Sequence, residues 1–201
     1  MRHYGIASLV LGIGLSIDLS GASADPMPAP AADYHARARA LPGVELSVAH
    51  HQGKVRVDVE RGNLPNGTVS LIDLPTSSVI VMMDVPGMDR IAVETDMPPG
   101  FAFSDAKRQG TRAGKGEVLG EACDLWRFAV PAFNQPVESC ITADGIVLRT
   151  TTQMNGKPVV LFEVTELSRT PQDPVAFALP KGMKPSKIPP SMRALLPGLG
   201  R

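Results

Sequence analysis

Alternation of apolar and polar residues near the start of the chain constrains the fold more than any other feature. Valine or leucine stands at every second position of residues 44–48, and valine does so at 55–59, with Gln52-Gly53 between the two stretches. Successive side chains of a strand point to opposite faces, and a short glycine-containing turn is typical of a hairpin. The pattern therefore predicts a hairpin with one buried face.

Further short apolar runs, separated by turns rich in proline, glycine and asparagine, predict that the sheet continues. These runs lie at residues 69–74, 78–83, 89–94, 117–120, 123–130, 137–142, 145–152 and 158–167. The 19 glycines, the 19 prolines and the low aromatic content of 4% suit short strands joined by turns. We expect a mainly β chain of the α+β class: an antiparallel curved sheet or half-barrel with one or few short helices.

The segments outside these runs divide the chain. Residues 25–40 predict a flexible leader with a possible short helix at 34–41, residues 41–184 a single β domain, and residues 185–201 a proline-rich tail. Residues 96–116 are rich in glycine, proline and charge. This stretch predicts either a functional loop or a poorly ordered insertion.

The first residues have the pattern of a secretory signal peptide at 1–24. A basic start at Arg2 is followed by an apolar run at 6–17 and by the small residues Ala22 and Ala24. We expect cleavage after Ala24 and a periplasmic or secreted protein without stable membrane insertion of the mature chain. The alternative, an uncleaved anchor helix, is disfavoured because Asp18 interrupts the apolar run.

The charge balance excludes one class of partner. The chain has 20 basic and 20 acidic residues, whereas proteins that hold a phosphate backbone need a clustered surplus of lysine and arginine. We expect no nucleic-acid partner.

The chain has two cysteines, Cys123 and Cys140, which fall on successive predicted strands. Opposed residues of a hairpin have a separation that suits a disulfide, and the bond would form in an exported protein. The alternatives are two free thiols, or a metal site for which two cysteines supply too few ligands.

Sequence motifs of catalysis are missing. The chain has no GxSxG, HExxH, CxxC or phosphate-binding glycine loop, so we expect no enzyme activity, no catalytic residue, no metal and no cofactor. His50 and His51 are expected to be solvated turn histidines that would point to opposite faces of a strand. Asp84 and Asp89 flank a turn and are expected to be solvating charges rather than a catalytic pair.

Three short patterns resemble a known group of proteins. They are Gly120-Glu121-Ala122-Cys123, Asp144-Gly145-Ile146-Val147-Leu148-Arg149, and the ending Phe177-Ala178-Leu179-Pro180-Lys181-Gly182. Together with the order of the strands over residues 44–184, they resemble secreted bacterial domains grouped near the LolA/LolB lipoprotein carriers. The resemblance implies an antiparallel half-barrel whose apolar concave side receives acyl chains in the carriers. The helices that line the carrier cavity have no match here, and no lipoprotein-handling residue can be transferred.

These observations predict an exported, non-enzymatic binding protein. We expect a lipid, acyl chain or apolar peptide to lie on the concave face of the sheet. The partner is expected to be a hydrophobic ligand or a lipidated protein. The candidate ligand-binding residues are Val57, Ile80, Met82, Ile91 and Val93. The alternative is an envelope protein-interaction or sensor module without a small ligand. A hydrolase would require Asp84, Asp89 or His51 to converge in a cleft.

Overall fold

The computed structural model describes residues 24–40, 43–65, 67–97, 109–130 and 134–187, and places thirteen strands in one sheet. The strands are β1 (Asp25–Pro26), β2 (Tyr34–Ala40), β3 (Val44–His51), β4 (Lys54–Arg61), β5 (Val69–Asp73), β6 (Ser78–Met83), β7 (Ile91–Asp96), β8 (Gln109–Val118), β9 (Glu121–Phe128), β10 (Val137–Ile141), β11 (Val147–Met154), β12 (Lys157–Ser168) and β13 (Ser186–Lys187). The helical element of these residues is one 3₁₀ turn, η1 (Pro174–Phe177). The fold is mainly β, and the expected α+β class is not supported.

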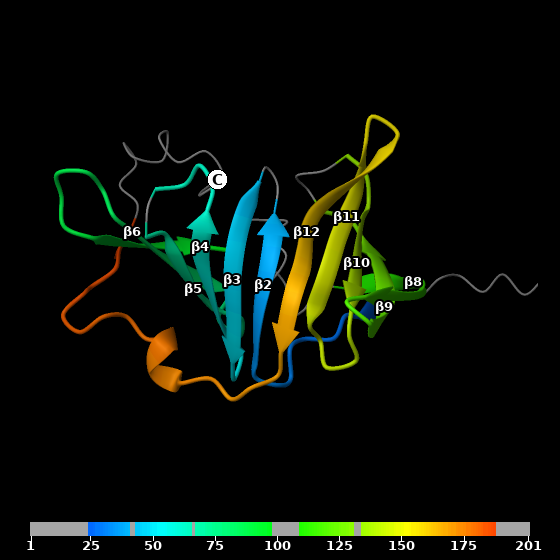
Figure 1. Ribbon diagram of the computed structural model, residues 1–201, viewed down its shortest axis with the longest axis horizontal. Helices are drawn as coiled ribbons and strands as arrows, with labels where there is room; N and C mark the ends of the chain where they lie inside the picture. Colours follow the sequence, from blue (N-terminus) through cyan, green and yellow to red (C-terminus); the bar gives the residue numbers. More distant parts are fainter. Residues whose placement is uncertain (1–23, 41–42, 66, 98–108, 131–133, 188–201) are drawn as a thin grey trace, which may run out of the picture.

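The sheet consists of two antiparallel meanders joined in the middle. Its order is β1-β8-β9-β10-β11-β12-β2-β3-β4-β5-β6-β7-β13, so β2 lies between the last strand of one meander and the first strand pair of the other. Figure 1 shows β2, β3 and β12 at the centre, with the outer strands inclined to them. This inclination is the twist expected of a sheet of L-amino acids.

The predicted helix at 34–41 is wrong where the structure describes it, because residues 34–40 form the central strand β2. Alanines at 36, 38 and 40 favour a helix in isolation. However, Tyr34, Ala36 and Ala38 are buried, while the residues between them are more exposed. That period of two, and the pairing of both strand edges, overrides the local propensity.

Three other segments are more ordered than predicted. Asp25–Pro26, in the expected flexible leader, pairs with β8, and Ser186–Lys187, in the expected tail, pairs in parallel with β7. The predicted loop 96–116 contains most of the ten-residue strand β8. In β8, charged and glycine residues are exposed on one edge of the sheet, which removes the apolar alternation that would have marked a strand.

The hairpin predicted at Gln52-Gly53 is confirmed. β3 pairs with β4 from Glu45 to His51, and the two turn residues have φ values of 47° and 78°. Positive φ at both positions is the requirement of a type I′ turn, and glycine meets it without steric cost.

One face of the sheet carries the main hydrophobic core, and we call it the inner face. In register across it lie Ala36 of β2, Val48 of β3, Val57 of β4 and Val81 of β6. On the other meander, Trp126 and Phe128 share a face and are buried. The opposite side, the outer face, is mostly polar at β2 and β3 and apolar at β5 and β6.

Within the described ranges, the structure contains no helix long and apolar enough to cross a bilayer. The predicted signal peptide cannot be compared, because residues 1–23 lie outside the described residues.

The predicted disulfide is present between Cys123 of β9 and Cys140 of β10. The register places Cys140 opposite Leu125, so the bond joins residues offset by two positions rather than directly opposed ones. Both cysteines are buried in the main core cluster. The bond therefore fixes the register of two strands from inside the core.

We expect Cys123→Ser or Cys140→Ser to lower the melting temperature clearly. The crosslink closes a loop with a sequence separation of 17, and loops of that size correspond to about 3 kcal/mol in chain-entropy models. Calorimetry of both variants, with a thiol count of zero in the wild type, checks this. Two reactive thiols in the native protein would contradict the disulfide.

Candidate ligand-binding pocket under the C-terminal strap

After β12 the chain returns across the outer face of the sheet. We call residues 174–183, from η1 to Met183, the C-terminal strap. Figure 1 shows the orange segment leaving β12 and passing the ends of β2 and β3 towards β5 and β6. Asp173 caps η1 by accepting a hydrogen bond from the Val175 N–H.

Polar and apolar contacts hold the strap on the sheet. The Arg56 Nη1 donates to the Ala176 carbonyl over 2.9 Å. Leu179 and Met183 pack against a cluster of apolar outer-face residues, Val69, Leu71, Met82 and Ala92. The strap therefore covers the apolar half of the outer face, which would otherwise be open to water.

A pocket of about 280 Å³ lies between the strap and the sheet. It is lined by Lys54, Val55, Leu71, Ile72, Asp73, Ser78, Ile80, Phe177, Ala178 and Leu179. Leu71 and Ile80 are directly opposed on β5 and β6 and form its apolar floor. Phe177 and Leu179 form its strap side.

Two opposite charges stand at the rim of this pocket. Lys54 and Asp73 are direct partners across β4 and β5, at the end of the strands. Asp73 Oδ1 accepts hydrogen bonds from the Thr76 N–H at 3.0 Å and the Thr76 hydroxyl at 2.8 Å. In the part of the chain that the structure describes, no ion pair joins Lys54 to Asp73 or to another acid.

The structure divides the five predicted ligand residues between the two faces. Val57, Ile91 and Val93 lie on the inner face, whereas Ile80 and Met82 lie on the outer face. Ile80 lines the pocket and Met82 belongs to the cluster under the strap. Residues 79–83 are all apolar, so alternation could not assign their faces, and a shift of one residue in register exchanges them.

His50 is not the solvated turn histidine that the sequence predicted. It is 1% exposed, stacks on Tyr34, donates from Nδ1 to the Ala32 carbonyl at 2.7 Å and accepts at Nε2 from the Gly53 N–H at 3.0 Å. Burial lowers the pKa of His50 below its ordinary value. The neutral ring ties the segment before β2 to the β3–β4 turn.

His51 points to the opposite face, as predicted, but it too is engaged. Its Nδ1 lies 2.9 Å from Asp33 Oδ2, and its ring contacts Phe177 of the strap. The Gln172 N–H donates to the same Asp33 oxygen at 2.9 Å and, with His51, holds the pKa of Asp33 below its usual value. This contact joins the strap's entry to the segment before β2.

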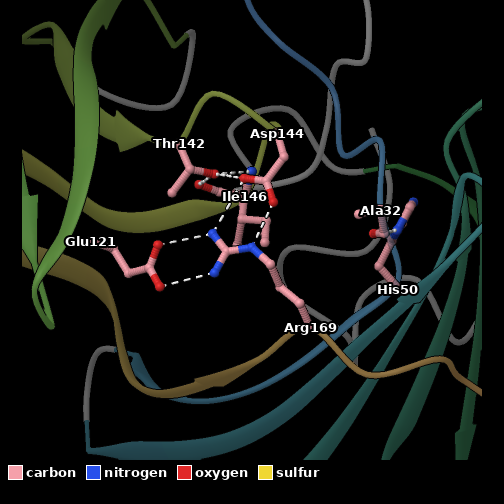
Figure 2. Close-up of polar contacts among 7 residues, drawn as sticks. All are labelled: Ala32, His50, Glu121, Thr142, Asp144, Ile146 and Arg169. Atoms are coloured by element: carbon pink, nitrogen blue, oxygen red, sulfur yellow. Dashed lines mark hydrogen bonds and ion pairs between the residues drawn. The ribbon is translucent and has the colours of Figure 1, made fainter.

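Asp84 and the charges around Arg169 form structural ion pairs. Asp84 accepts from Arg90 at 3.0 Å, and no contact with Asp89 places a second carboxylate beside it in the described residues. Arg169 donates two hydrogen bonds of 2.9 Å to Glu121 and one of 2.7 Å to Asp144. Figure 2 shows Arg169 between these two carboxylates. Arg169 follows β12, so this cluster fastens the end of that strand to the turns beside β9 and β11. Within the described ranges, no group of three or more potential ligands could hold a metal ion.

Sequence reasoning missed the strap and therefore the pocket. The strap has little regular structure, and its apolar residues Phe177 and Leu179 alternate over too short a stretch to predict a strand. The usable signal was their spacing of two, in a segment that is otherwise proline-rich.

Comparison with known proteins identifies the fold but no family. No family model and no curated protein matches the chain. An uncharacterized conserved protein from Thermus thermophilus is 15% identical, with a TM-score of 0.56 over 78% of this chain and 91% of that chain. Two crystal structures of PNGF-II, in space groups C2 and P21, are 15% and 14% identical, with TM-scores of 0.54 and 0.55 over 82% of this chain.

The chain spans about a third of the PNGF-II chain, namely 32% and 33% in the two structures. These likenesses show a shared fold and carry no activity across. The resemblance to LolA/LolB carriers stays a prediction.

We expect the free energy of unfolding to decrease as the pH drops below about 6.5, the ordinary pKa of histidine. Below that pH, His50 binds a proton in the unfolded state, whereas burial keeps its ring neutral in the folded state, so protonation favours unfolding. The pKa of His50 is lower in the folded state than in the unfolded state. The contribution of His50 to stability is therefore present above about pH 6.5 and is lost as the pH falls to its folded pKa. Urea unfolding between pH 8 and pH 4.5 measures this. His50→Gln should be less stable at pH 8 and show a smaller loss on acidification.

His35→Gln is the matched control, because His35 is only partly buried and bonds one side chain, Ser47. An unchanged pH profile in His50→Gln, or an equal change in His35→Gln, would contradict the role given to His50.

Proposed function

We propose that this chain is an exported, non-enzymatic binding protein that holds a lipid, acyl chain or apolar peptide. The observation that carries the proposal is the pocket under the strap, with Leu71 and Ile80 as its floor and Leu179 as its wall. Concave sites with mostly apolar walls and a few polar groups at the mouth are typical of small-molecule binding.

The dimensions of the pocket suit a short apolar group. Its 280 Å³ is close to the lower end of ligand sites. It corresponds to about nine times the ~30 Å³ that one water molecule occupies in the liquid. The pocket therefore has room for about nine methylene-sized units. The expected occupant is a tail of about eight to ten carbons or one large apolar side chain.

Export is part of the proposal. The disulfide supports an oxidising compartment, because cytosolic thiols are kept reduced. Cleavage after Ala24 would make Asp25, the first residue of β1, the new amino terminus. The strand would then begin at the terminus itself.

A half-barrel with an apolar concave side, as in LolA/LolB-like carriers, would offer a second place for the same ligand. The inner-face candidates favour it less. Val57 is 4% exposed and Val93 is 8% exposed, so a ligand there would have to displace packed side chains. Ile80 is only partly buried and already borders open volume.

The second candidate function is a protein-interaction module, favoured by the edge of the sheet at β7. Ser186–Lys187 pairs with Val93 and Glu94, two of the six β7 residues. An extended peptide could replace this short parallel pairing and add a strand to the edge.

We expect Ile80→Thr to weaken saturable binding of a fluorescent fatty-acid probe about fivefold or more, with a small loss of stability. The change removes apolar contact from the pocket floor, and one lost methylene in a binding pocket is worth about 1–3 kcal/mol. Probe titration and thermal unfolding of the same samples measure both effects.

Val57→Thr is the matched control on the inner face. It introduces the same hydroxyl at a buried core position. Val57→Thr should therefore lower the melting temperature more than Ile80→Thr does, and should weaken probe binding less. The reverse order in the two variants would move the site to the inner face. No saturable binding by the wild type would favour the interaction module.

A further inference from the structure

Some charged side chains around the pocket form ion pairs with other residues, and others do not. Arg56 bonds both oxygens of Asp58, at 2.7 and 2.6 Å, and also donates to the strap, so neither member of this pair is available to a ligand. Lys54 is exposed and has no ion pair within the described ranges. Among the described residues that line the pocket, Lys54 is therefore the cation that a ligand can reach.

Asp73 supplies the available anion. Its Oδ1 accepts both bonds from Thr76, and no bond to Oδ2 is found in the part of the chain that the structure describes. Lys54 and Asp73 are direct cross-strand partners, which places their Cβ atoms about 5 Å apart on one face. In the structure they nevertheless form no ion pair, although both border the same pocket.

We propose that the pocket takes a zwitterionic amphiphile: its apolar tail lies on Leu71 and Ile80, its anionic group meets Lys54 and its ammonium group meets Asp73. This inference rests on the proposed function, since it needs the pocket to hold an apolar ligand. It adds the class of head group. A ligand with both charges satisfies both rim groups, whereas a purely anionic or cationic ligand leaves one rim charge facing a like charge.

Both a free apolar amino acid and a single-chain zwitterionic lipid have this chemistry. Each places an ammonium group and an anionic group next to an apolar part. Because the pocket has room for about nine methylene-sized units, its volume admits either a large side chain or part of an acyl chain.

The test uses four ligands with similar tails: 2-aminodecanoic acid, decanoic acid, decylamine and 1-decanol. Isothermal titration calorimetry at pH 7 with the full mature chain gives their affinities. We expect the zwitterion to bind tightest. Each rim contact should contribute up to about fivefold, the upper range for exposed ion pairs.

Two charge-removing variants assign each contact. Lys54→Gln should remove the advantage of 2-aminodecanoic acid over decylamine, and Asp73→Asn should remove its advantage over decanoic acid. Asparagine can still accept the bonds from Thr76, so the turn is retained. Lys157→Gln, at the exposed start of β12, is the control and should change no affinity. Thermal unfolding of each variant verifies folding.

The outcomes separate the two proposals. Equal affinities for all four ligands, or decanoic acid binding tightest, would overturn the zwitterion inference while leaving the proposed function standing. Binding of none of them, together with no binding of the fatty-acid probe, would overturn both. L-phenylalanine and a lysophosphatidylethanolamine, titrated in the same way, distinguish an amino acid from a lipid as the source of the head group.

Discussion

The pairing of β2 on both its edges is the constraint on which the rest of the structure depends. Residues 34–40 pair with β3 along one edge, and with β12 along the other from His35 opposite Ser168 to Ala40 opposite Phe162. Without this strand the two meanders would be separate sheets. Its inner-face alanines, Ala36 and Ala38, are small, and the larger Phe162 and Val164 lie beside them in the core.

The segment just before β2 is also connected to the wall of the pocket under the strap. The His50 ring donates a hydrogen bond to the Ala32 carbonyl. Asp33 accepts hydrogen bonds from His51 and from the Gln172 N–H. His51 in turn contacts Phe177, which lines the pocket. The entry of the central strand and the entry of the strap are therefore tied by one carboxylate. A substitution at Asp33 would therefore alter the position of Phe177 in the pocket wall, although Asp33 itself does not line the pocket.

Alternation predicted the strands well where one face is buried and the other is exposed, as in the hairpin around Gln52-Gly53. It failed at Tyr34–Ala40, where alanine propensity concealed a period of two, and at β8, where exposed glycines and charges left no apolar pattern. Of the five predicted ligand residues, Ile80 lines the pocket under the strap, but alternation did not assign its face. The pairing of β12 with β2 and the path of the strap depend on contacts between residues more than 90 positions apart, such as Arg56 with Ala176, and no local pattern encodes these.

The two ends of the described chain both serve as very short outer strands, Asp25–Pro26 beside β8 and Ser186–Lys187 beside β7. Unpaired strand edges are templates for intermolecular pairing, and proline, lysine and short edge strands are the usual protections against it. Pro26 lacks the N–H that a further strand would need, and Lys187 adds a charge. Proteolytic trimming at either end would leave the residues that line the pocket under the strap in place but expose a longer strand edge. Its first consequence would therefore be self-association of the protein into aggregates.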